Sequence, residues 1–172
     1  MGTRLMPPQL KQTGMAFIRA AACIIALSLS ALPGHAQQNP FGELAGSWAG
    51  NGNITLNSGT RERINCRANY ETPESGTSIR LALRCASDSY TFDFSANGVY
   101  RDGVITGQWD ERTRRAAGTF TGSVKGNHIE GRAEGQTFSA LLGLTTTGNR
   151  QSISIRSPGS TLSDVAIVLS RK

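Results

Sequence analysis

From Gly46 to the C-terminus, apolar residues recur at every second position in short runs, not at the three- and four-residue spacing of a helix. This alternation is typical of β-strands that bury one face. Turn-forming segments separate the runs, including Asn57-Ser58-Gly59, Asp102-Gly103, Gly126-Asn127 and Gly148-Asn149. The pattern predicts an all-β domain built as a single antiparallel meander of about ten strands and closed into an up-and-down barrel.

The cysteines select one pairing register for the early strands. If Cys66 lies opposite Cys85, the apolar side chains of both strands share one face and opposite charges meet on the other. The facing pairs would then be Ala68–Leu83, Tyr70–Leu81, Glu71–Arg80 and Arg63–Asp88. A loop at Asn57-Ser58-Gly59 puts Trp48 on the same face as Cys66. The register also sets Arg67 against Arg84, a pair of like charges that either splays apart or holds an anion.

The N-terminus has the features of a secretory signal peptide. Basic residues precede the apolar run Ala20–Leu32, and small residues precede a cleavage point after Ala36. The run is too short to cross a bilayer as a helix, so no membrane span is expected in the mature chain. Met15 opens a compact signal of its own and is the expected translation start. We therefore predict a leader over 1–36, a short segment over 37–43 and the barrel domain over 44–172, in a periplasmic or secreted protein.

Removal of the leader changes the chemistry that the chain can offer. Three basic residues leave with it, which lowers the net charge from +6 to +3 and weakens any case for nucleic acid. Cys66 and Cys85 remain, and two cysteines in an exported chain are expected to form a disulfide. His128 is the remaining histidine and lies beside a turn, where an exposed strand-end role is expected. We expect no metal site, no cofactor and no catalytic residues, and hence no enzyme.

The charged turn after the strand that ends near Trp109 offers the main alternatives to inert surface. Asp110 and Glu111 are adjacent and are expected to be solvated. Arg112-Thr113-Arg114-Arg115 follows, and is either a solvated loop balanced by those carboxylates or a site for phosphate, lipid headgroups or an acidic partner. The candidate anion contacts are Arg67, Arg84, Arg112, Arg114 and Arg115.

The inward positions of the predicted barrel combine aromatic residues with glycines. The aromatic residues that would line a candidate interior pocket are Trp48, Phe92, Phe94, Trp109, Phe120 and Phe138. The glycines assigned to the same face are Gly50, Gly52, Gly107, Gly118, Gly122, Gly131 and Gly143. Glycines in strands more often serve bends and bulges, but missing side chains beside aromatic rings can also leave room for an apolar ligand.

The opening Leu44-Ala45-Gly46-Ser47-Trp48 resembles the first strand of calycin-type barrels, the lipocalins, fatty-acid-binding proteins and avidins. Thr106-Gly107-Gln108-Trp109 and Gly118-Thr119-Phe120 are similar to avidin strands. The same opening, with Cys66 and Cys85, resembles exported metalloprotease inhibitors of the serralysin-inhibitor type, and the whole chain resembles small secreted alphaproteobacterial proteins with no assigned function. No binding residue is carried over from these families.

These observations together favour a calycin-like barrel that binds a small apolar or envelope-derived ligand in its interior, without catalysis. The alternative is a periplasmic protein-binding module, such as a protease inhibitor that uses its N-terminal segment, Gln37 to Glu43, and the barrel mouth. An enzyme is the least favoured class, because no nucleophile, base or metal cluster is visible in the sequence.

Overall fold

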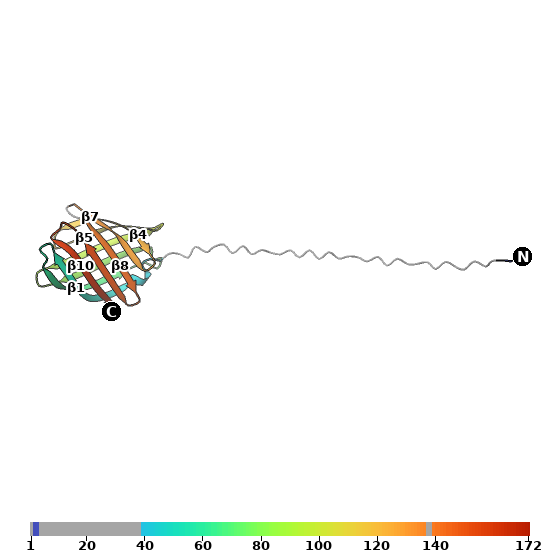
Figure 1. Cartoon of the computed structure of the whole chain (residues 1–172), viewed down its shortest axis with the longest axis horizontal. Coiled ribbons are helices and arrows are strands. Elements are labelled where there is room, and N and C mark those ends of the chain that lie inside the picture. Colours follow the sequence, from blue (N-terminus) through green and yellow to red (C-terminus); the bar gives the residue numbers. More distant parts are fainter. Residues whose placement is uncertain (1, 4–38, 137–138) are drawn as a thin grey trace. The chain divides into compact units, whose positions relative to one another are not determined.

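The computed structural model describes residues 2–3, 39–136 and 139–172, so nearly all of the predicted leader, and Phe138, lie outside the described residues. Ten antiparallel strands form a closed barrel (Figure 1). Their bounds are β1 Gly46–Leu56, β2 Arg61–Glu71, β3 Ser78–Ala86, β4 Thr91–Arg101, β5 Val104–Glu111, β6 Ala116–Lys125, β7 His128–Gly135, β8 Ser139–Thr147, β9 Arg150–Arg156 and β10 Leu162–Arg171. Each strand pairs with its neighbour in sequence, and β1 pairs with β10 to close the sheet. The predicted up-and-down meander is confirmed. No helix in the described part of the chain is long and apolar enough to span a bilayer.

The predicted register of the first strands is also confirmed. Cys66 faces Cys85 and is bonded to it, and the ladder continues to Glu71 opposite Arg80. Gly59 adopts a φ of 85° in the first hairpin loop, as a left-handed glycine does. One predicted pair is wrong: the β2–β3 ladder ends at Asn65 opposite Ala86, so Arg63 and Asp88 do not face each other.

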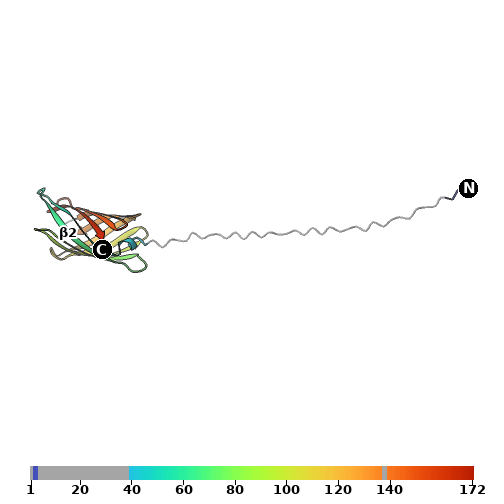
Figure 2. The ribbon, with the colours of Figure 1, turned by 90° about the horizontal axis from the view of Figure 1, so that it is seen from below.

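Two layers of strands face each other across the core in the turned view of Figure 2, with the red C-terminal strands opposite the green early ones. Large side chains fill the space between them. The fully buried ones include Trp48, Ile54, Ile64 and Leu169, with exposures of 1% or less. The predicted alternation is therefore confirmed, because every second side chain of these strands points into a common apolar core.

Aromatic rings occupy the space beside several interior glycines. A Cβ placed on Gly118 would lie 2.7 Å from Cζ2 of Trp109, and one on Gly131 would lie 2.5 Å from Cζ of Phe120. The missing side chains thus let the two rings lie flat against the sheet. Gly143 is a correction to the predicted inward set: it pairs with Ser154 and Glu130, and so belongs to the outer face.

The segment before β1 closes one end of the barrel. A short 3-10 turn, Gly42–Leu44, follows Phe41, and the side chains of Phe41 and Leu44 are buried at 1% and 3% exposure. The indole N–H of Trp48 donates a 2.8 Å hydrogen bond to the carbonyl of Leu44. Arg171, at the end of β10, donates to the carbonyls of Glu43 and Ala45, and its guanidinium lies 4.3 Å above the Trp48 ring. We call residues 39–45 the plug.

A polar chain lies inside the barrel near the plug. The buried Tyr70 hydroxyl donates a 2.7 Å hydrogen bond to Oε1 of Gln151, whose amide in turn donates to the Thr146 hydroxyl at 3.3 Å. Burial raises the pKa of Tyr70 far above its usual value, outweighing the hydrogen bond to Gln151, so the hydroxyl stays a donor. Each of the three side chains therefore has a polar partner inside the barrel, as buried polar groups require.

We predict that the Cys66–Cys85 bond is a large part of the barrel's stability. The bond closes a loop of sequence separation 19, which is worth about 3 kcal/mol in the chain-entropy model. In a Cys23→Ala background, alkylation of the unreduced, unfolded protein should label neither cysteine. The Cys66→Ala/Cys85→Ala double variant should unfold at lower denaturant and with a larger m-value, because the unfolded chain is no longer held compact by the bond. Stoichiometric alkylation without reduction would contradict the bond.

Candidate functional site

The end of the barrel opposite the plug is formed by the β5–β6 turn and the start of β4. Glu111 ends β5 there and is buried at 7% exposure. Its neighbour Asp110 points to the outer face and keeps 54% of its side-chain exposure. The expectation that both carboxylates are solvated is therefore right for Asp110 and wrong for Glu111, because the period of two turns adjacent side chains to opposite faces.

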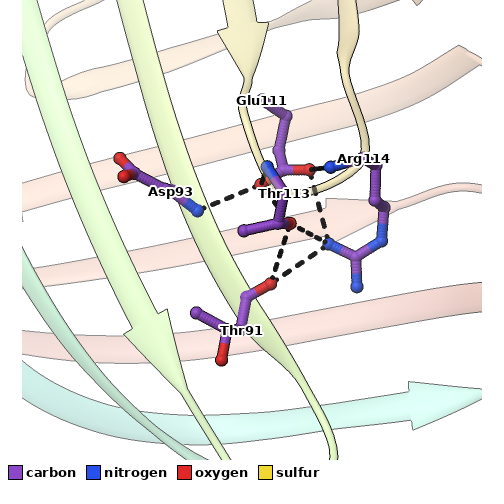
Figure 3. Close-up of polar contacts among 5 residues, drawn as sticks. All are labelled: Thr91, Asp93, Glu111, Thr113 and Arg114. Carbon is purple, nitrogen blue, oxygen red and sulfur yellow. Dashed lines mark hydrogen bonds and ion pairs between the residues drawn. The ribbon is translucent and has the colours of Figure 1, made fainter.

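Figure 3 shows the Glu111 carboxylate at the centre of a hydrogen-bond network. Oε1 accepts from the backbone N–H of Asp93 at 3.0 Å, from the Thr113 hydroxyl at 2.7 Å and from the Thr113 N–H at 3.2 Å. Oε2 accepts from the N–H of Arg114 at 2.9 Å and from its Nη1 at 3.4 Å. One side chain thus ties the start of β4 to the β5–β6 turn.

Burial by itself raises the pKa of the Glu111 carboxyl. The hydrogen bonds from the Thr113 hydroxyl and from the N–H groups of Asp93, Thr113 and Arg114 favour the charged form and outweigh that effect. The net result is a pKa below the ordinary value for glutamate. Glu111 is therefore an anchored anion at neutral pH, unlike a general acid, whose pKa must be raised.

Glu111 and its neighbours hold Arg114 over two aromatic rings. Nη1 of Arg114 also donates to the Thr91 carbonyl at 3.2 Å and to the Thr113 hydroxyl at 3.0 Å. The guanidinium carbon lies 4.5 Å from the centroid of the Phe92 ring and 5.7 Å from that of Tyr90. Such stacking covers apolar surface while the outer edge of the cation stays accessible.

The predicted pocket residues separate into different parts of the barrel. Trp48 lies under the plug, and Phe120 lies over Gly131. Phe92 and Phe94 are partly buried on β4, and Phe94 stacks on Trp109 with ring centroids 5.9 Å apart. We call Phe92, Phe94, Trp109 and Arg114 the aromatic mouth. It brings together three of the six predicted aromatic residues.

The predicted anion contacts do not share one ligand position. Arg67 does face Arg84, but Arg84 turns to Asp93, with 3.1 Å between Nη2 and Oδ2. Arg112 approaches the same carboxylate at 3.7 Å. Arg115 occupies the turn with a φ of 53°, a left-handed conformation that is unusual for a non-glycine residue. The Arg84 guanidinium thus pairs with the Asp93 carboxylate of the next strand.

The barrel is similar to solved structures of other proteins. Rv2717c of M. tuberculosis superposes with a TM-score of 0.61 at 16% identity, over 80% of this chain and 98% of that one. The fold is that of the calycin-type barrels. The S-type phycobiliprotein lyase CPES of Guillardia theta superposes with a TM-score of 0.57 at 13% identity, over 77% of this chain and 90% of that one. No family model and no curated protein matches the sequence.

The second likeness corrects one expectation. The sequence was expected to exclude an enzyme, because it shows no familiar catalytic cluster. The same barrel serves a protein named as a lyase, so the missing motifs do not exclude catalysis, and that expectation is wrong. Function belongs to sites placed on a fold and has to be argued from them.

We predict that Glu111→Gln loosens the turn and lowers the stability at neutral pH by about 1–3 kcal/mol, since an amide replaces a carboxylate that accepts several hydrogen bonds. Because the folded-state pKa is lowered, this stabilisation is complete above the ordinary glutamate pKa and is lost as the pH falls through the folded-state value. Urea unfolding of both proteins at neutral and at acidic pH measures it.

Glu130→Gln is the matched control. Glu130 is exposed and bound to Lys125 at 2.6 Å, so its replacement should change the stability little. A difference between Glu111→Gln and the parent that persists unchanged at acidic pH would contradict the anchoring role of the charge.

Proposed function

We propose that the chain binds a small apolar or envelope-derived ligand at the aromatic mouth. The observation that carries this proposal is a pair of partly buried phenylalanines, Phe92 and Phe94, on the inward face at the end that the plug does not cover. Ligand sites in barrels of this kind lie in their mouths, and are lined by apolar and aromatic side chains with a few polar groups. Arg114 supplies such a polar group beside Phe92.

The interior supports a ligand that enters only part of the way. Trp109 and Phe120 fill the space beside Gly118 and Gly131, and the plug buries Phe41 at the far end. A bound molecule would therefore contact Phe92, Phe94 and the edge of Trp109. The inhibitor alternative has less support, because its N-terminal segment contains this buried Phe41.

We also propose that the protein works in the periplasm or outside the cell, with residues 1–36 as a leader. The buried Cys66–Cys85 bond supports this, since structural disulfides persist in oxidising compartments.

Titration with the neutral fluorophore N-phenyl-1-naphthylamine tests the mouth. The parent should bind it saturably, and Phe92→Ala should weaken binding roughly tenfold, because part of a buried phenyl contact is lost. Phe92→Leu, which keeps apolar volume, should retain most of the affinity and guards against a folding defect in the alanine variant.

Leu141→Ala is the control for a nonspecific apolar effect, since Leu141 is 48% exposed on the outer face. Equal losses in Leu141→Ala and Phe92→Ala, or no saturable binding by the folded parent, would refute the proposed mouth. Native mass spectrometry of protein purified from its own host would reveal a retained natural ligand.

A further inference from the structure

A second concave surface lies on the outside of the barrel, across β1 and β7–β10. Its cavity has a volume of about 730 Å³. The polar side chains that line it are Asn51, Asn53, His128, Thr145, Arg150, Ser152, Ser154 and Ser170. It is separate from the aromatic mouth, because these side chains have the outward parity of their strands. We call it the outer groove.

The strand register arranges the centre of the outer groove as a row. Asn51, Val168, Ser152, Thr145 and His128 are successive partners on β1, β10, β9, β8 and β7. Five strands at the usual spacing place the ends of the row about 19 Å apart. The imidazole Nδ1 of His128 lies 2.8 Å from the Thr145 hydroxyl, which fixes the ring over the end of the row.

Small residues hollow out the next row. Gly143 and Ala166 lie there, and a Cβ on Gly143 would come within 2.9 Å of the Ser154 hydroxyl and 3.6 Å of the His128 ring. Gly143, which the sequence analysis assigned to the inward face, thus forms the floor of the outer groove beside His128. A Cβ at this position would require the Ser154 hydroxyl to shift, whereas the His128 ring would be at an ordinary van der Waals distance.

The charge of the lining favours an anion. Arg150 and His128 belong to it, and no carboxylate does. Of the nearest outward carboxylates, Glu130 binds Lys125 at 2.6 Å and also lies 3.9 Å from Nε2 of His128, and Asp164 approaches Arg156 at 3.8 Å. Among the described residues, Arg150 is the groove cation with no carboxylate within ion-pair distance.

Beyond β1 the cationic surface continues. Arg63 is the register partner of Asn53, and Arg67 is the partner of Ala49. Neither arginine has an ion pair with a residue in the described part of the chain. Arg63, Arg67 and Arg150 therefore border the hydroxyl and amide groups of the outer groove.

The other large concavity on the outer face has the opposite character. It crosses β2–β7 with a volume of about 950 Å³, and its lining includes Glu71, Asp110 and Glu134 with the single cation Arg80. The two concavities thus differ in charge, since carboxylates predominate in this lining and Arg150 is the arginine in the lining of the outer groove.

We propose that the outer groove binds an acidic oligosaccharide. Its hydroxyl and amide groups match sugar hydroxyls, and Arg150, with Arg63 and Arg67, matches the carboxylates or sulfates that such a chain carries. A row about 19 Å long suits several linked sugar units. Among the described residues, no phenylalanine, tyrosine or tryptophan lines the groove, so it lacks the large stacking platforms of single-stranded nucleic-acid sites. This inference does not depend on the aromatic mouth.

Calorimetric titration of the full chain tests the proposal with four probes: tetragalacturonic acid, neutral maltotetraose, sodium sulfate and a thymidine oligonucleotide. The acidic tetrasaccharide should bind, and should bind more weakly as salt is raised, because exposed charges are screened. Maltotetraose and sulfate should each bind at least tenfold more weakly. Equal affinity for sulfate would reduce the groove to a simple anion site, and tighter binding of the oligonucleotide would overturn the proposed ligand class.

Arg150→Gln and His128→Gln should each weaken tetragalacturonate binding about five- to tenfold. Arg80→Gln, which removes an exposed arginine from the acidic concavity, is the matched control and should have no effect. Equal losses in Arg150→Gln and Arg80→Gln would show a response to net charge alone and would overturn the site. Binding of N-phenyl-1-naphthylamine should be the same in all these variants, so that failure of the outer groove is distinguishable from failure of the mouth.

Discussion

Pairing of β1 with β10 is the constraint on which the rest of the molecule depends. It removes both free edges of the sheet and makes every strand two-sided, with one face in the core and the other in water. Side-chain parity then decides the environment of each residue. A shift of one residue in the pairing of β1 with β10 would turn Trp48 or Leu169 out of the core. The disulfide between Cys66 and Cys85 lies on the inward face and holds the β2–β3 register at one point.

A closed barrel still has two ends, and here they differ. At one end the plug contributes Phe41 and Leu44 to the core, and Arg171 clamps it through two carbonyls. At the other end the strands finish on half-buried aromatic side chains, and Glu111 orders the turn above them. Packing at the plug end therefore serves stability, whereas the opposite end keeps apolar surface that a ligand can cover.

Much of this architecture could be predicted from local pattern. Alternation, turn residues and the two cysteines were enough for the strand number, the closure and the pairing of Ala68 with Leu83. The pattern was insufficient where a strand ends. Arg63 and Asp88 lie beyond the β2–β3 ladder. Glu111 is buried because the N–H groups of Thr113 and Arg114 in the adjoining turn and that of Asp93 on β4 converge on its carboxylate.

At the candidate site, too, some features could be predicted from the sequence pattern and others could not. Parity alone could place Phe92, Phe94 and Trp109 on the inward face. It could not show that the ring of Phe120 lies against Gly131 and fills space in which a pocket was expected. For Glu111 the sequence contained one signal of burial: its position has inward parity on β5. The enzyme class is a different case, since the absence of a familiar catalytic motif does not exclude catalysis in a barrel of this fold.

The opposed pair Arg67 and Arg84 links the core register to the surface charge. Facing cations are unfavourable in isolation, and the register that buries the disulfide imposes them. Asp93 on the next strand removes the conflict by taking Arg84, with Arg112 on the same carboxylate. Arg67 has no such partner among the described residues and lies on the other side, next to β1, at the edge of the outer groove that contains Arg150. The register that buries the disulfide thus also decides which arginine of the Arg67–Arg84 pair has a carboxylate partner.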